Sequence, residues 1–224
     1  MAASIRETLL KAGLPTIEVG GVAFARRVSK ALGRNTDDID LAITLPRGVN
    51  VKERAETAIR ALHAIDYNTN PFLRGPAGTD FYGFISDKRH PMKLDLFVDG
   101  VCDFRDRSDG RGTGCKIYVD DEKGKSLSKE GILLCKLIAD REGDREDVAT
   151  LLLSGFDRPT FLRKTQTQLS CPGNGKARLI DSLRWIESHY APTSSYQPTN
   201  PIVERRRKDI SDRATQLREA LARS

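Results

Sequence analysis

Residues 38–43, Asp-Ile-Asp-Leu-Ala-Ile, place two aspartates one residue apart in an otherwise apolar segment. Successive side chains of a β-strand point to opposite faces of the sheet, so a strand here puts Asp38 and Asp40 on one face and Ile39, Leu41 and Ile43 in a core. Two carboxylates on one face repel each other unless a cation lies between them. Their hard oxygen atoms suit Mg²⁺ (or Mn²⁺). The alternative is a solvated turn, because aspartate also favours turns and helix caps.

A glycine pair precedes this segment by about the length of one helix. Residues 16–19 predict a short strand, Gly20 and Gly21 follow, and residues 22–32 are typical of a helix that ends at Gly33. A strand that leads through glycines into the start of a helix lets backbone N–H groups approach a phosphate. The alternative is a plain tight turn that needs a positive φ.

Residues 93–98, Lys-Leu-Asp-Leu-Phe-Val, predict a second strand. Alternation places the apolar residues 94, 96 and 98 on one face, and Lys93, Asp95 and Phe97 on the other. If this strand pairs beside the first, Asp95 becomes a third carboxylate near Asp38 and Asp40, and the three form a candidate metal site. An exposed charge on an edge strand is the alternative interpretation.

Together these segments resemble the DNA polymerase β-like nucleotidyltransferase superfamily. The pattern is Gly20-Gly21-x-Ala23, then Arg34-x-Thr36-x-Asp38-Ile39-Asp40-Leu41, then Asp95 on a later strand. Within that superfamily the chain is most similar to the AbiEii-type family, which includes toxins of type IV toxin–antitoxin systems. The likeness spans residues 16–155.

The AbiEii-type family also carries a helical lysine followed by a charged segment with arginine and aspartate. The matching residues here are Lys136, Arg141, Arg145 and Asp147. The family's usual Lys-Asp-x-x-Asp ending appears as Glu146-Asp147-x-x-Thr150, so the second acid is missing. Without the resemblance, Lys136 is also typical of a lysine that extends from an apolar helix face to water. Asp147 is equally typical of an acid in the first turn of a helix capped by Asp144.

The resemblance implies transfer of a nucleoside monophosphate from an NTP to an acceptor hydroxyl, with release of pyrophosphate. In that reaction Asp38 and Asp40 hold Mg²⁺, and Asp95 completes a two-metal site or helps to deprotonate the acceptor. The phosphates are held by the residues that match the family's binding motifs, and these are Gly20, Gly21, Arg34, Thr36, Lys136 and Arg141. Asp147 orients Lys136 or the nucleotide.

The toxin resemblance further implies that the acceptor is the 3′ end of tRNA, where added nucleotides block aminoacylation and translation. It also implies a cognate antitoxin as a partner. Two alternatives stay open: a small-molecule nucleotidyltransferase, such as one that modifies an aminoglycoside, and a catalytically inactive module that binds a nucleotide or a protein partner.

Composition supports an anionic partner. The chain carries 37 Lys and Arg against 31 Asp and Glu, a formal charge of +6, which favours nucleotide or RNA.

The four cysteines show no Cys-x-x-Cys spacing, which predicts reduced thiols and no zinc site. No signal-like segment opens the chain, and no stretch approaches the ~18–20 apolar residues that span a bilayer. We therefore expect a cytoplasmic protein without a membrane segment.

The order of expected elements predicts an α/β (α+β) fold: a small mixed-sheet nucleotidyltransferase core over residues 1–125 and a mainly helical region over residues 126–224. Strands are expected at 80–85, which pairs with 93–98, and at 116–119. Helices are expected from a capping box at Ser4 to Gly13, and at 51–65, 144–155, 173–190 and 202–224.

Two features of the C-terminal region have a structural and a functional interpretation. Residues 205–208, Arg-Arg-Arg-Lys, are able to bind RNA phosphates, but such a run is more often a solvated helix face. Trp185 lies on the apolar side of its helix, which favours a place in the core over a base-stacking role.

Overall fold

The computed structural model describes residues 2–28, 38–74, 81–86, 93–102, 115–170, 172–191 and 201–224. The chain divides into two compact units. The first comprises Met1–Phe104 and Lys116–Ser128, and the second Arg105–Cys115 and Lys129–Ser224. The sequence-based boundary, between residues 125 and 126, falls in the last segment of the first unit. The expected mixed α/β fold with a helical C-terminal region is confirmed.

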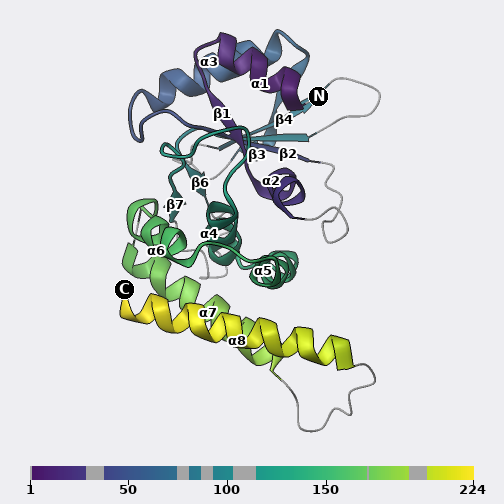
Figure 1. Cartoon of the computed structure of the whole chain (residues 1–224). Helices are drawn as coiled ribbons and strands as arrows, with labels where there is room; N and C mark the ends of the chain where they lie inside the picture. Colours follow the sequence, from purple (N-terminus) through teal and green to yellow (C-terminus); the bar gives the residue numbers. More distant parts are fainter. Residues whose placement is uncertain are drawn as a thin grey trace. The chain divides into compact units, whose positions relative to one another are not determined.

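A five-stranded mixed sheet forms the centre of the first unit (Figure 1), in the order β1-β2-β5-β4-β3. The strands are β1 (Thr16–Glu18), β2 (Ile39–Ile43), β3 (Tyr67–Arg74), β4 (Phe81–Ser86) and β5 (Lys93–Phe97). Only β2 and β5 run parallel among the paired strands that the structure describes. The expected pairing of β2 with β5, and of β4 with β5, is therefore confirmed.

One face of this sheet is covered by α1 (Ala2–Lys11) and α3 (Val51–His63), while α2 (Gly20–Arg27) lies on the other face (Figure 1). The apolar side chains of β2 and β5 enter the core on the first face, as the alternation predicts. The buried residues of that core are Ile5, Leu9, Leu14, Ile39, Leu41, Ile43, Ala55, Ala58, Leu62, Tyr67, Phe84, Leu94, Leu96 and Val98. The opposite face of β2 and β5, which carries Asp40 and Asp95, is thus not part of this core.

Two helix boundaries in the first unit differ from the prediction. Helix α1 already begins at Ala2, so Ser4 lies inside the helix and the expected capping box is wrong. Helix α2 ends at Arg27, because Val28 is extended, with φ −103° and ψ 150°, and is buried. The prediction of a helix up to Leu32 is therefore wrong at Val28, and its end at Gly33 lies outside the described residues.

A second, two-stranded sheet pairs β6 (Val101–Cys102) with β7 (Lys116–Ile117). The strand expected over residues 116–119 is confirmed for its first two residues. Cys115, just before β7, is disulfide-bonded, whereas Cys135 is a free thiol. The expectation of reduced thiols is therefore wrong for Cys115, because pairing depends on how close the fold brings two cysteines, which their spacing in the sequence does not show.

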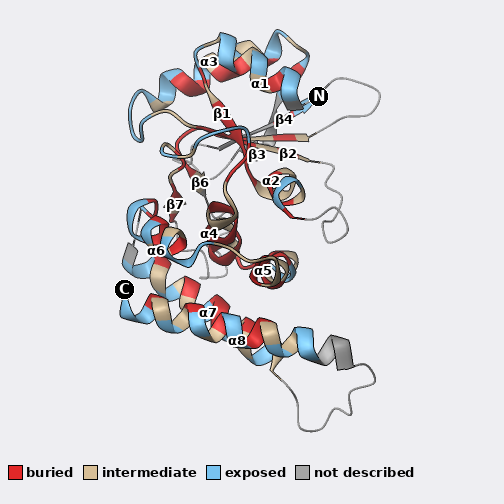
Figure 2. Ribbon diagram, in the orientation of Figure 1, coloured by how far each residue is buried: buried red, intermediate tan, exposed pale blue. Residues whose placement is uncertain are grey.

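The second unit is helical. Its helices are α4 (Lys129–Ala139), α5 (Glu142–Ser154), α6 (Arg158–Thr167), α7 (Pro172–Tyr190) and α8 (Pro201–Arg223). Helix α4 is buried along most of its length, and α8 alternates buried and exposed positions (Figure 2). The helices expected at 173–190 and 202–224 are confirmed to within one residue at each end. Over the described ranges, no helix combines the length and apolar character needed to cross a membrane.

Candidate active site

Asp40 and Asp95 face each other across the parallel pair β2–β5. They are register partners, so both side chains lie on the sheet face opposite the apolar core. The Asp95 side chain is 13% exposed and Asp40 is partly buried. Burial and the negative charge of Asp95 raise the pKa of Asp40 to about 6, against the opposing effect of a hydrogen bond from the Gly21 backbone. The two carboxylates therefore repel each other, as the sequence pattern implies.

Lys93 lies on the same face and contacts two of the aspartates. Its Nζ atom is 2.7 Å from Asp95 Oδ2 and 3.7 Å from Asp38 Oδ2. The sequence placed Lys93 and Asp95 on one face but assigned no role to the lysine. Burial opposes its charge, but the hydrogen bond to Asp95 and the charges of Asp95, Asp38 and Asp40 outweigh burial and raise the pKa of Lys93. Lys93 is thus a fixed positive charge among the predicted metal ligands.

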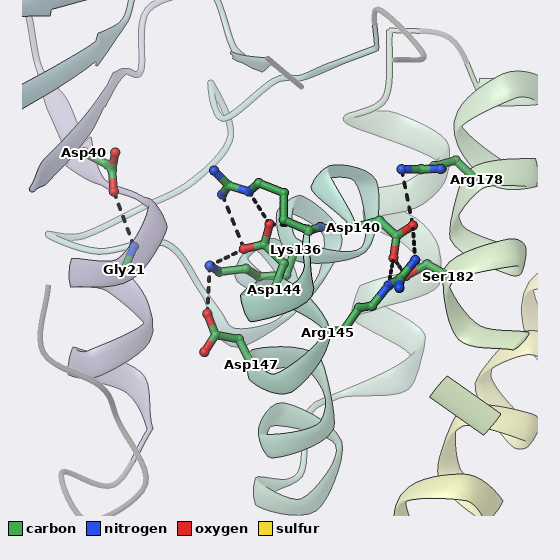
Figure 3. Close-up of polar contacts among 10 residues, drawn as sticks. Gly21, Asp40, Lys136, Asp140, Asp144, Arg145, Asp147, Arg178 and Ser182 are labelled. Atoms are coloured by element: carbon green, nitrogen blue, oxygen red, sulfur yellow. Dashed lines mark hydrogen bonds and ion pairs between the residues drawn. The ribbon is translucent and has the colours of Figure 1, made fainter. Parts of the chain in front are cut away.

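The glycine pair touches this carboxylate face directly. Gly20 is the first residue of α2 and has φ +57°, and a Cβ atom added there would lie 2.1 Å from Asp40 Oδ2. Gly21 donates its backbone N–H to the same oxygen at 3.4 Å (Figure 3). Position 20 requires glycine for two reasons, the left-handed backbone and the closeness of Asp40. In this structure the Gly21 amide faces a carboxylate, which is negatively charged as a phosphate is.

A buried ion pair anchors α2 beside the site. Glu18 of β1 has a side chain only 2% exposed, and it accepts two hydrogen bonds from Arg26, at 2.6 and 2.8 Å. Arg27 donates to the backbone carbonyls of Ser126 and Leu127. Sequence analysis missed this anchor. Its one available signal was an acid at the end of a buried strand, followed eight residues later by an arginine pair.

The first unit thus brings together Asp38, Asp40, Asp95, Gly20 and Gly21. Arg34 and Thr36, which the resemblance assigns to phosphate binding, lie outside the described residues. Within the described residues, no three or more histidine, cysteine, aspartate or glutamate side chains are grouped so that they could hold a metal ion. The donor set that the structure presents is therefore the Asp40–Asp95 pair, with Asp38 beside Lys93.

The other predicted site residues belong to the second unit. Lys136 of α4 is buried, and its Nζ atom lies 2.6 Å from Asp144 Oδ1 and 2.8 Å from Asp147 Oδ2 (Figure 3). The alternative interpretation, a lysine that extends to water, is wrong, because the Lys136 side chain is 5% exposed and is paired with two carboxylates of α5. Such a pair is costly to break, because removing one partner leaves a buried charge uncompensated.

Arg141 and Asp147 take positions that sequence reasoning only partly foresaw. Arg141 is the N-cap residue of α5, and Asp144 is at N3, where its carboxylate accepts from the Arg141 backbone at 3.4 Å and side chain at 2.6 Å. Asp144 is therefore not the N-cap, and Asp147 lies in the second turn. The interpretation of Asp147 as a first-turn acid is wrong, whereas its contact with Lys136 fits the orienting role.

A second ion cluster, which sequence analysis missed, is centred on Asp140. This residue has φ +48° between α4 and α5, and its buried carboxylate accepts from Arg145 at 2.7 and 3.1 Å and from Ser182 at 3.0 Å. Arg178 of α7 lies 3.2 Å away (Figure 3). The cluster ties α7 to the turn between α4 and α5. No local pattern links residue 140 to residues 178 and 182, because their partnership depends on helix packing.

The basic run is largely exposed on its helix, as the structural interpretation predicts, whereas Trp185 is not among the buried core residues. Arg205, Arg206 and Lys208 are exposed on α8, while Arg207 packs over the Tyr190 ring. Trp185 is partly buried, with the Arg145 guanidinium 4.1 Å from its ring centroid and the His189 ring stacked on it at 4.5 Å. The Trp185 ring is therefore already in stacking contact with other side chains of the protein.

Comparison of the sequence with models of protein families finds no match, and comparison with curated proteins finds none either.

Proposed function

We propose that this protein is a divalent-metal-dependent nucleotidyltransferase that moves a nucleoside monophosphate from an NTP to an acceptor hydroxyl. The observation that carries the proposal is the Asp40–Asp95 pair on adjacent parallel strands, with the Gly20–Gly21 turn against Asp40. The resemblance of these same segments to the DNA polymerase β-like superfamily supports the same reaction.

The donor set fits magnesium or manganese. Mg²⁺ is usually held by one or two carboxylates, and it completes its shell with water and substrate phosphates, so a pair of aspartates is sufficient. Burial and the charge of Asp95 together raise the pKa of Asp40, and a divalent cation would relieve the repulsion between the two carboxylates. In this proposal Asp40 and Asp95 hold the ion, with Asp38 beside them. The bound ion supplies charge neutralisation for the phosphates.

In the proposed reaction the acceptor hydroxyl oxygen bonds to the α-phosphorus of the NTP. The bond from that phosphorus to the α–β bridging oxygen breaks, and the electron pair leaves with pyrophosphate. The hydroxyl proton passes to a carboxylate of the site, for which Asp95 is the candidate. In this proposal the N–H groups at the start of α2, beside Gly20 and Gly21, bind a phosphate oxygen.

Existing ion pairs limit the roles that we propose for Lys136, Arg141 and Asp147. Lys136 already has two carboxylate partners within its own unit, so phosphate binding requires it to share or release one of them. Arg141 has a side chain that is 67% exposed, but it also pairs with Asp144 at 2.6 Å, so phosphate binding requires it to share or release that carboxylate. Asp147, 2.8 Å from Lys136, sets the position of the lysine ammonium in this proposal.

We further propose, from the AbiEii-type resemblance, that the acceptor is the 3′ end of tRNA and that the protein is a toxin held in check by a cognate antitoxin. The excess of basic residues, 37 against 31 acidic, is compatible with an RNA acceptor.

The test is a transfer assay with each of the four NTPs, labelled in turn at the α- and the γ-phosphate, with total tRNA and Mg²⁺. Nucleotidyl transfer puts the α-label on RNA and leaves the γ-label in pyrophosphate. The matched acceptor control is periodate-oxidised tRNA, which lacks the 3′ hydroxyl and is expected to gain no label. Label from the γ-position on RNA contradicts the reaction class, and α-label on oxidised tRNA contradicts the 3′ end as acceptor.

A further inference from the structure

Four side chains form a square on the polar face of β2 and β5. Asp40 and Asp95 are register partners, and the same register continued two residues back places Asp38 opposite Lys93. Strand alternation puts all four on one face. One row of the square is therefore a like-charge pair, and the other is an opposite-charge pair.

The ammonium group of Lys93 lies in the corner of this square where a second cation would bind. Its Nζ atom is 2.7 Å from Asp95 Oδ2 and 3.7 Å from Asp38 Oδ2, so it touches one carboxylate of each row. In a two-metal site the ions lie about 3.5–4 Å apart and share a carboxylate. A second ion shared through Asp95 would have to displace the lysine from that oxygen.

The net charge of the four side chains also favours a single divalent cation. Three carboxylates and one ammonium sum to −2, which one divalent cation balances. Without the lysine the sum is −3, and one divalent cation leaves a negative charge that attracts another. The two ion pairs of Lys93, with Asp95 and Asp38, hold its ammonium group among these carboxylates.

We infer that Lys93 takes the place of the second metal ion in this site, so that the site binds a single divalent cation between Asp40 and Asp95. This inference rests on the proposed function, which requires a metal at these carboxylates. It assigns Lys93 as a positioning residue that holds Asp95 and Asp38.

The experiment counts Mn²⁺ ions bound to the nucleotide-free protein by electron paramagnetic resonance of the free ion, at protein concentrations above the dissociation constant. The wild type is expected to bind one ion. Lys93→Met is expected to bind two, or to bind its first ion at least about tenfold more tightly, because the competing charge is gone. Lys93→Arg keeps the charge and is expected to bind one.

Lys116→Met is the matched control, because Lys116 also pairs with an aspartate of the same unit, Asp99, at 3.3 Å. It is expected to bind one ion with wild-type affinity. If Lys93→Met does not fold, as judged by its thermal unfolding, Lys93→Gln retains a hydrogen-bond donor without the charge and replaces it.

Two ions on the wild type, or the same count and affinity for the wild type and the Lys93→Met or Lys93→Gln variant, would overturn the inference and leave the proposed metal site standing. No Mn²⁺ on any of these proteins would overturn the metal requirement of the proposed function, and the inference with it.

Discussion

Gly20 and Asp40 approach so closely that a Cβ atom on residue 20 would lie 2.1 Å from the Asp40 Oδ2 atom. The first residue of α2 therefore packs directly against the second residue of β2. Any side chain at position 20 must displace either the helix start or the carboxylate. The glycine pair noted in the sequence therefore has a specific neighbour in the fold, the Asp40 carboxylate.

Gly20→Ala is expected to lower the free energy of unfolding by about 3 kcal/mol or more, because the left-handed φ of +57° adds roughly 1–2 kcal/mol to the overlap with Asp40. The loss in the free energy of unfolding is measured by urea denaturation, followed by circular dichroism. Gly13→Ala is the matched control, since Gly13 has φ +80° but nothing within 4 Å of an added Cβ. Equal losses for the two variants would show that the Asp40 contact has no effect. Adding Asp40→Ala to Gly20→Ala should recover part of the loss.

Asp40→Asn is expected to change how stability depends on pH in metal-free buffer. The folded-state pKa of Asp40, about 6, lies above its ordinary value of 3.8, so the native state binds more protons between these values. The Asp40 contribution to stability is therefore fully present below pH 3.8 and is lost as the pH rises through 6. From pH 4 to pH 7 the wild type should lose about 2–3 kcal/mol relative to Asp40→Asn. A constant difference between the two proteins contradicts this account.

The pair of Glu18 and Arg26 is expected to respond unequally to removal of its two partners. Arg26→Met leaves the Glu18 carboxylate, 2% exposed, without its arginine and should cost about 3 kcal/mol. Glu18→Gln removes the buried charge and leaves Arg26, 54% exposed, in contact with water, so it should cost about 1 kcal/mol. Thermal or urea unfolding distinguishes the two. The reverse order would contradict the role of Arg26 as the required counter-ion.

Lys136→Met is expected to destabilise the protein by about 3–5 kcal/mol, because it leaves Asp144 and Asp147 buried without the ammonium group. Arg141→Gln, with a side chain 67% exposed, should cost less than about 1 kcal/mol. Asp147→Asn added to Lys136→Met should restore part of the stability. A near-neutral Lys136→Met variant would show that the pair contributes little, and would favour a purely functional lysine.

Strand alternation allowed the central part of the fold to be predicted. The segments around Asp40 and Asp95 have a period of two, and a period of two determines which side chains share a face. Their pairing then followed from the small number of ways in which such strands can lie side by side. The glycine pair was also detectable, because a left-handed φ restricts the choice of residue.

The remaining contacts depend on tertiary packing and have no local signal. Alternation places Lys93 on the face of Asp95, but its contact with Asp38 depends on the parallel register, which the sequence does not specify. Asp140 meets Arg178 and Ser182 only after α7 packs beside α4 and α5. The end of α2 at Arg27 is another case, since burial of Val28 in an extended conformation overrides a helical pattern.

The account depends most directly on Asp95, and the decisive measurement is the rate of α-label transfer to tRNA by Asp95→Asn. Asp66→Asn is the matched control, because Asp66 is exposed in the same unit and has φ +65°, which asparagine adopts readily. We expect Asp95→Asn to lose at least about a thousandfold in rate, as removal of a main electrostatic group does, and Asp66→Asn to stay within about twofold, since a surface substitution changes little. Equal rates for the two variants, or no transfer by the wild type with any NTP, would contradict the proposed activity.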